Sequence, residues 1–149
     1  MKIHIGADHA GFELKKSLVD FLLSQNHEVK DYGAHTYDVL DDYPDFILPV
    51  AKAVAANPHD WGIVIGGSGQ GEAIAANRIQ GVRAIAYYHH DVEIVRLARA
   101  HNDANVLSFG ARFVDQESAI EAFTVFLQTD SSDDDKYGRR IKKVKNNSL

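Results

Sequence analysis

The sequence of 149 residues has no cysteine, no excess of basic residues and no apolar run long enough to span a membrane. The lack of cysteine excludes disulfides and thiol catalysis, and it is compatible with the cytoplasmic location that we expect. A formal net charge of −5 argues against general nucleic-acid binding, which usually needs a basic surface. We also expect no membrane partner, and residues 1–5 have a strand pattern rather than the pattern of a signal peptide.

Apolar segments with strand and helix periodicity alternate along most of the chain. Strands are predicted over 3–6, 27–32, 61–65, 82–88 and 105–109. Helices are predicted over 11–25, capped by Asp8, over 44–57, from the loop after the third strand to about 81, over 90–101 and over 115–128. Pro49 is expected to kink or delay the second helix.

This alternation predicts an α/β fold, a three-layer α/β/α sandwich around a five-stranded, mainly parallel, Rossmann-like sheet. We assign residues 1–130 to a single α/β domain. Residues 131–149 form a C-terminal tail, with an acidic run at 131–135 before a basic segment. We expect that segment to be a helix that packs on the domain or on a partner subunit.

The glycine-rich stretch 66–72, GGSGQGE, lies between the predicted third strand and the third helix. Its glycines let the backbone turn tightly and bring several N–H groups close to a ligand. At a helix N-terminus such a loop favours an anion. It lacks the Lys-Ser/Thr ending of a Walker loop and the acidic residue of a dinucleotide-binding turn.

Glu72 is unexpected at the edge of an anion site. A carboxylate there is explained if it removes a proton whose departure creates the anion. The alternative is that Glu72 stabilises the dipole of the helix in which it lies. The loop sequence by itself leaves both readings open.

Other polar residues follow the predicted strands. Asp8 and His9 come after the first strand, and Arg112 comes after the fifth. Ligands of parallel sheets bind at this carboxyl edge. The segment 101–103, by contrast, precedes the fifth strand and lies at the opposite edge of the same subunit. A neighbouring subunit would resolve that discrepancy.

Three segments together resemble the signatures of ribose-5-phosphate isomerase type B. They are 6–12, GADHAGF; 66–72 with 75–78, AANR; and 101–107, HNDANVL. That family also contains allose-6-phosphate and galactose-6-phosphate isomerases, and the likeness covers about residues 1–128. The resemblance implies an aldose–ketose isomerase without metal or organic cofactor. It also implies a base that takes the C2 proton, an enediolate, and return of the proton at C1.

The resemblance also suggests roles for individual residues. Some family members use a cysteine where this chain has Gly66, whereas another branch uses a glutamate that Glu72 matches. His101 matches the proton donor for opening of the sugar ring, and Ser68 a hydroxyl that supports ring opening or binding. The remaining expected substrate contacts are Asp8, His9, the loop residues Gly67, Ser68, Gly69, Gln70 and Gly71, then Asn102, Arg112, Arg139 and Lys143, the last in place of a usual arginine.

Ordinary structural roles compete with several of these assignments. Asp8 can be a helix cap, Ser68 a turn serine, and His101 a residue that complements a helix dipole. Adjacent His89 and His90 point about 100° apart on a helix, so we predict no metal site there. Two functions therefore stand: a sugar-phosphate isomerase acting as a homodimer with a shared site, with tetramers left open, or a noncatalytic phosphate- or nucleotide-binding module. Within the first, the substrate is ribose 5-phosphate, or else an allose, galactose or tetrose phosphate.

Overall fold

The computed structural model describes residues 1–146. Its centre is a five-stranded sheet in the order β2-β1-β3-β5-β4, and every neighbouring pair is parallel. The predicted α/β class with a mainly parallel sheet is thus confirmed. The strands are β1 (Lys2–Ala7), β2 (Glu28–Asp31), β3 (Trp61–Gly66), β4 (Ala84–Tyr87) and β5 (Val106–Gly110).

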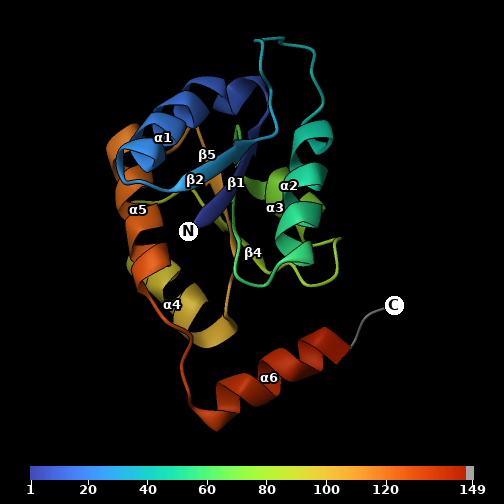
Figure 1. Cartoon of the computed structure of the whole chain (residues 1–149), viewed down its shortest axis with the longest axis vertical. Coiled ribbons are helices and arrows are strands. Elements are labelled where there is room, and N and C mark those ends of the chain that lie inside the picture. The colour runs from blue at the N-terminus through green and yellow to red at the C-terminus, as the bar shows by residue number, and fades with distance from the viewer. Residues whose placement is uncertain (147–149) are drawn as a thin grey trace.

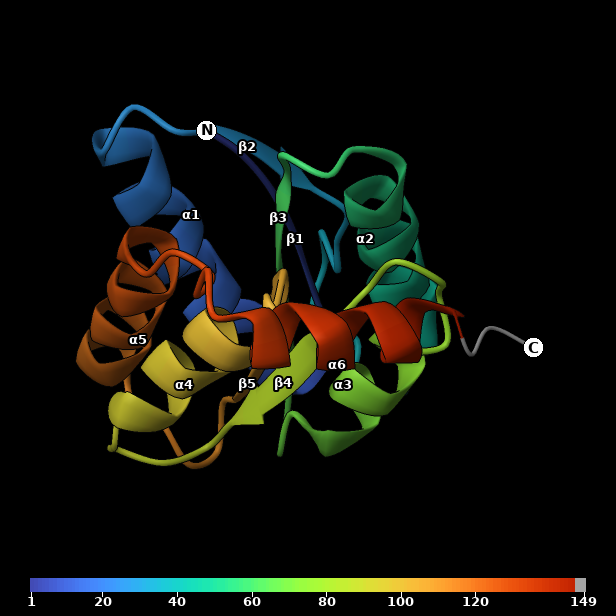
Figure 2. The same ribbon diagram turned by 90° about the horizontal axis from the view of Figure 1, so that it is seen from below.

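Helices cover both faces of the sheet and complete the three layers (Figures 1 and 2). On one side lie α1, α4 and α5, and on the other α2 and α3. Their bounds are α1 (Phe12–Ser24), α2 (Pro44–Ala56), α3 (Gln70–Ala76), α4 (Glu93–Asn102) and α5 (Gln116–Gln128), with a short 3₁₀ helix η1 (His9–Gly11) before α1.

The central strands are buried on both faces, which explains why they read as continuous apolar runs rather than alternating ones. Ile63 and Ile65 of β3 face the core under α1, α4 and α5, whereas Val64 faces the smaller core under α2 and α3. This double burial fixes the end of β3, and therefore the start of the glycine loop, in a rigid setting.

Three helix predictions need correction. The third helix ends at Ala76 rather than near residue 81. Asn77 ends it, because its side-chain amide accepts from the Ala84 N–H at 2.8 Å and donates to the Ala84 carbonyl at 2.9 Å. Pro49 does not delay α2, which begins at Pro44 and continues through it. The fourth helix begins at Glu93 instead of residue 90.

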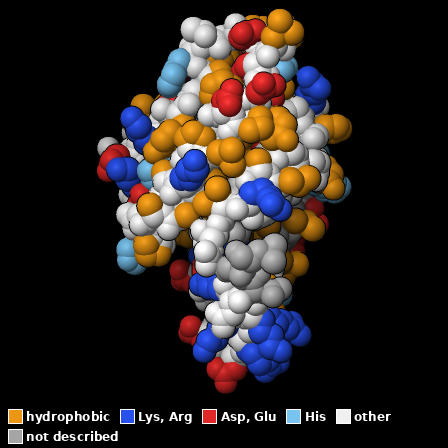
Figure 3. Space-filling view, turned by 90° about the vertical axis from the view of Figure 1, so that its right-hand side faces the viewer, with side chains coloured by type: hydrophobic (Ala, Val, Ile, Leu, Met, Phe, Trp, Pro, Cys, Tyr) orange, Lys and Arg blue, Asp and Glu red, His pale blue; other side chains and the backbone are white. Residues whose placement is uncertain are grey.

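Beyond α5 the chain forms one more helix, α6 (Asp135–Asn146), which lies apart from the two helical layers (Figure 1). None of its residues is buried. Figure 3 shows a dense group of Lys and Arg side chains at this end of the molecule. Residues 147–149, the end of the predicted tail, lie outside the described part of the chain. Within residues 1–146, no helix combines the length and apolar character needed to cross a membrane.

Candidate active site

The glycine loop joins β3 to α3 and is held against the neighbouring strand β5. Gly69 has a φ of +77°, and a Cβ there would come within 2.9 Å of the Phe109 backbone. The buried Ser108 hydroxyl donates to the Gly69 carbonyl at 2.7 Å. Glycine is therefore required at position 69 both by the left-handed backbone and by the close approach of β5.

Glu72 lies in the first turn of α3, three residues after its N-cap Gly69, and is only 4% exposed. Its carboxylate lies directly against the Cα of Gly66, so any Cβ at position 66 would overlap the carboxylate oxygens. Gly66 thus leaves the space that Glu72 occupies at the end of β3. A cysteine at position 66 and the present position of Glu72 exclude one another sterically.

Burial raises the pKa of Glu72 above the ordinary glutamate value. The negative charge of Asp8 adds to the increase, while the backbone N–H groups of Glu72 and Gly69 oppose it. The contact with the Gly69 N–H is that of a capping box, in which an N3 glutamate satisfies the N-cap amide. Glu72 therefore has a structural role. Burial also makes its carboxylate easier to protonate than that of an exposed glutamate, which suits a residue that accepts a proton.

The other residues of the glycine loop add exposed polar groups, and an aromatic ring packs against the loop. Ser68 and Gln70 are exposed, and the Gln70 N–H points to the Ser68 Oγ at 3.4 Å. Tyr43, at the N-terminus of α2, packs so close to Gly71 that a Cβ on Gly71 would lie 3.0 Å from its ring. Tyr43 was not among the predicted site residues.

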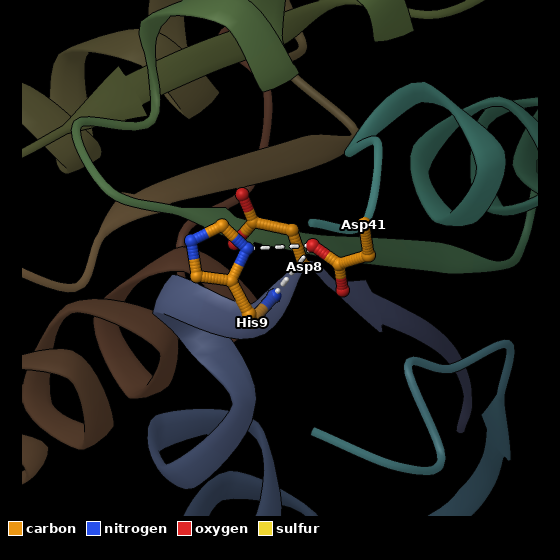
Figure 4. A group of neighbouring side chains, drawn as sticks. All are labelled: Asp8, His9 and Asp41. Carbon is orange, nitrogen blue, oxygen red and sulfur yellow. Dashed lines mark hydrogen bonds and ion pairs between the residues drawn. The ribbon is translucent and has the colours of Figure 1, made fainter. Parts of the chain in front are cut away.

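Asp8 and His9 follow β1 at the same edge of the sheet. Asp8 caps the short helix η1 rather than the long helix α1 for which it was predicted, and it accepts from the N–H groups of Ala10 and Gly11 at 2.9 and 3.2 Å. The His9 ring is held by Asp41, whose Oδ1 accepts from Nδ1 at 2.6 Å and from the His9 backbone N–H at 3.2 Å (Figure 4). Since Nδ1 is engaged, the Nε2 atom of His9 is the one left for a ligand.

Asp41 belongs to the loop 35–43 between β2 and α2, and its side chain is only 8% exposed. Its second oxygen, Oδ2, is buried without a hydrogen-bond partner. Tyr37 of the same loop packs edge-on against His9, with ring centroids 6.2 Å apart. The loop therefore holds the imidazole from two sides, a role that the sequence did not reveal.

Asp8, His9 and Asp41 are also the group within residues 1–146 whose donor atoms lie close enough to share a metal ion, within 4.8 Å of one another. Their interactions already have another explanation. Asp8 Oδ1 caps a helix, and Asp41 Oδ1 accepts a hydrogen bond from the His9 ring. We interpret His9 and Asp41 as a hydrogen-bonded pair that orients the His9 ring, and Asp8 as a neighbouring helix cap.

Arg112 follows β5 and reaches back over the glycine loop. A Cβ on Gly67 would lie 3.2 Å from the Arg112 guanidinium carbon. Arg112 is exposed, and its backbone N–H donates to the Gly67 carbonyl at 3.1 Å. A guanidinium at this position can bind an anionic group of a ligand in the loop.

His101 and Asn102 lie at the C-terminus of α4, at the opposite end of the sheet from Glu72. Asp103 stabilises this end of α4 by ion pairs with Arg83 at 2.8 Å and Arg99 at 2.9 Å. Asn102 is exposed. The chain by itself does not bring His101 and Asn102 to the glycine loop.

Arg139 and Lys143 are exposed on α6, also far from the loop in this chain. Tyr137 of α6 contacts the domain, and its ring stacks on His101. Lys136 and Arg140 flank that ring, at 4.7 and 5.9 Å from its centroid.

The structure thus collects one part of the predicted site and separates the other. Asp8, His9, the loop 67–71, Glu72 and Arg112 lie together at the carboxyl edge of the sheet. His101, Asn102, Arg139 and Lys143 lie beyond the other edge. The missed residues Tyr43 and Asp41 had one sequence signal, the acidic loop that precedes Pro44.

Residues 3–144 match the family model described as Ribose/Galactose Isomerase. The chain is 42% identical over 142 residues to ribose-5-phosphate isomerase B of Mycobacterium leprae, covering 95% of this chain and 86% of the relative. It is 43% identical over 118 residues to ribose-5-phosphate isomerase B of Escherichia coli, covering 79% and 77%.

Solved structures of ribose-5-phosphate isomerase B are also similar to this chain. Ribose-5-phosphate isomerase B of Clostridium thermocellum superposes with a TM-score of 0.91 at 40% identity, over 98% of this chain and 96% of that one. The enzyme of Mycoplasma genitalium, solved with bound ribulose-5-phosphate, superposes with a TM-score of 0.91 at 37% identity, over 97% and 94%.

Proposed function

Because the chain belongs to the Ribose/Galactose Isomerase family, it is an isomerase that interconverts ribose 5-phosphate and ribulose 5-phosphate, and we propose that Glu72 is the base of that reaction. Ribose 5-phosphate is favoured over allose, galactose or tetrose phosphates by the relatives' names and by the ribulose-5-phosphate bound to the Mycoplasma enzyme. The alternative of a noncatalytic binding module is set aside, since these relatives are enzymes.

The observation that carries the proposal is the place of the Glu72 carboxylate, buried against Gly66 beside the loop amides. From there it takes the C2 proton of the open-chain aldose, and the electron pair of that C–H bond forms the C1–C2 double bond of an enediolate. The carbonyl oxygen gains the negative charge and is protonated. Return of the proton from Glu72 to C1 and loss of the C2 hydroxyl proton give the ketose.

The loop next to Glu72 supplies groups that fit the developing charge. Backbone N–H groups in the stretch 67–71 stabilise the enediolate oxygens without reorganising, because β5 fixes the turn. Ser68, Asp8 and His9 bind the sugar hydroxyls, with His9 Nε2 oriented by Asp41. Arg112 binds the phosphate.

We place the second half of the site on a partner subunit of a homodimer. His101, the proposed proton donor for ring opening, and Asn102, a proposed hydroxyl contact, lie too far from Glu72 within one chain, at the other end of the sheet. The basic helix α6 also lies at that end, whereas the loop 35–43 at the Glu72 end carries several aspartates (Figure 3). This charge difference favours contact between the α6 end of one chain and the loop end of another.

The cations of α6 complete the phosphate site in this arrangement. The family resemblance assigns Arg139 and Lys143 to it, whereas Lys136 and Arg140 lie close to the ring that contacts His101. Single alanine variants of the four residues show which pair binds the phosphate. Loss of a phosphate contact raises KM more than it lowers kcat, so the pair whose variants raise KM is the one that binds it. A cytoplasmic location and a mechanism without cofactor remain predictions from the sequence.

The test of the base compares wild type with Glu72→Gln. Glutamine keeps the capping contact to the Gly69 N–H but accepts no proton, so kcat is expected to fall by about 10³-fold with little change in KM. NMR in deuterated water reports both conversion of ribose 5-phosphate and exchange at C1 and C2. Because the Glu72 pKa is raised, wild-type activity should fall on acidification at a higher pH than an ordinary glutamate would give. Undiminished exchange in Glu72→Gln would exclude Glu72 as the base.

A further inference from the structure

Tyr137 joins α6 to the end of α4. Its ring is parallel to that of His101, with centroids 4.1 Å apart and an angle of 10° between the planes. Tyr137 and Ile141, four residues apart and so on one face, are the half-buried residues of α6, and the other described residues of this helix are exposed. The Ser132 N–H donates to the Ala100 carbonyl at 2.8 Å and brings the tail alongside α4.

Tyr137 also connects His101 to two cations. Lys136 Nζ lies 4.7 Å and Arg140 Cζ 5.9 Å from the centre of the tyrosine ring, within the range of cation–π attraction. Arg139, by contrast, projects from α6 about 160° away from Tyr137, at 100° per residue. One aromatic ring thus contacts both the imidazole and two positively charged side chains.

An imidazole at a helix C-terminus can turn about its side-chain bonds unless a neighbour fixes its plane. The Tyr137 ring covers one face of His101, so the ring nitrogens are directed sideways, along the plane of the stack. His101 is partly exposed, and its ring nitrogens are the atoms that exchange protons. Stacking therefore sets the direction of proton transfer without occupying a nitrogen.

We propose that Tyr137 is a positioning residue for His101, holding the imidazole in the plane from which it protonates the ring oxygen of ribose 5-phosphate bound to the partner subunit. This inference rests on the proposed role of His101 as the ring-opening proton donor. It adds a residue of the tail to the site and gives α6 a task beyond supplying charge.

The chemistry of the two substrates separates this role from a purely structural one. Ribose 5-phosphate closes a furanose ring through its C4 hydroxyl, and that ring must open before the C2 proton can leave. Ribulose 5-phosphate has its only suitable hydroxyl, at C5, esterified with phosphate, so it stays open-chain. Solvent exchange at its C1 requires the base but no ring opening.

The experiment measures both reactions by NMR in wild type, Tyr137→Leu and Tyr137→Phe. Tyr137→Leu is expected to lower kcat for ribose 5-phosphate about tenfold while C1 exchange of ribulose 5-phosphate stays within about twofold of wild type. Tyr137→Phe, which keeps the ring, should match wild type in both. An equal loss in both reactions, or no loss in Tyr137→Leu, would overturn the proposal.

Two further variants separate failure of this inference from failure of its premise. His101→Ala should show the same selective loss, to a larger extent, whereas an unselective result there would reject the role of His101 itself. A selective loss in His101→Ala without one in Tyr137→Leu would reject only the role of Tyr137. Ile141→Ala loosens the other half-buried contact of α6 but leaves the stacked ring, so its rates should stay near wild type. A selective loss in Ile141→Ala would assign the effect to helix docking instead.

Discussion

The two ends of the sheet hold their polar side chains in different ways. At the carboxyl end, Glu72 is buried against Gly66, and Asp41 fixes His9 with two hydrogen bonds. At the other end, His101 is partly exposed and stacks on Tyr137, a residue of a helix that has no buried side chain. The first end is preorganised by the fold of one chain, and the second presents its groups outward.

This difference explains how one small domain can divide a reaction between two copies. Deprotonation at carbon needs a dry, rigid site, which the doubly buried strand β3 and the adjacent β5 provide. Ring opening and phosphate binding need groups that contact the part of the substrate that this site leaves exposed. In the proposed homodimer, an outward-facing histidine with a basic helix beside it would supply these groups to the neighbouring subunit.

Among variants that keep Glu72 and His101, the largest expected effect comes from filling the space at Gly66. Gly66→Ala places a methyl group where the Glu72 carboxylate lies, so the base is displaced by about 1 Å or more and kcat should fall by at least about 10²-fold. Steady-state kinetics with ribose 5-phosphate measures this. Gly138→Ala, on α6 with no atom within 4 Å of an added Cβ, is the matched control and should retain wild-type kcat. Full activity in Gly66→Ala would show that the observed carboxylate position is not the working one.

The division between the two ends can be tested by mixing chains. Glu72→Gln and His101→Ala are each expected to be inactive or impaired alone. Refolded together, they should regain about a quarter of wild-type activity, because half of a random mixture is heterodimer with one intact site of two. Activity of the mixture no greater than the mean of the two variants would place Glu72 and His101 in separate functions or in one chain.

A smaller effect is expected from loosening His9 at the preorganised end. Asp41→Ala removes the acceptor for the His9 ring and backbone, and KM for ribose 5-phosphate should rise about tenfold with kcat less affected. Asp41→Asn, which keeps an acceptor oxygen, should lie in between. The neighbouring exposed Asp42→Ala serves as control. Equal KM values for Asp41→Ala and Asp42→Ala would remove the proposed role of Asp41.

The smallest effect concerns stability. The raised Glu72 pKa means that the folded chain holds this proton more tightly than the unfolded chain, so the charged carboxylate destabilises the fold once the pH exceeds the ordinary glutamate pKa. Glu72→Gln should therefore be more stable than wild type by about 1 kcal/mol at neutral pH. The gain should vanish near about pH 4, where both states are protonated. Denaturant unfolding at both pH values measures it, and a pH-independent difference would contradict the burial argument.

Many features of the fold were predictable because they depend on local patterns. The apolar runs 61–65 and 105–109 marked strands, and the helix start at residue 44 is confirmed, whereas Asp8 caps the short helix η1 in front of the predicted one. The end of the third helix was not predictable, since it depends on a side chain, Asn77, pairing with a strand seven residues further on. The same holds for Asp41, whose hydrogen bonds to His9 cross 32 residues of sequence.

The sequence by itself determined the alternation of strands and helices and the glycine loop that ends in a glutamate. The alternation follows from the periodicity of the apolar residues, and the loop follows from the backbone freedom of glycines that lie within a few residues of one another. Only the tertiary structure decided that Glu72 fills the space left by Gly66, that Asp41 orients His9, and that Tyr137 lies on His101. Each of these contacts joins elements whose distance in space is set by packing of the whole sheet and its helices, and no local pattern encodes that distance.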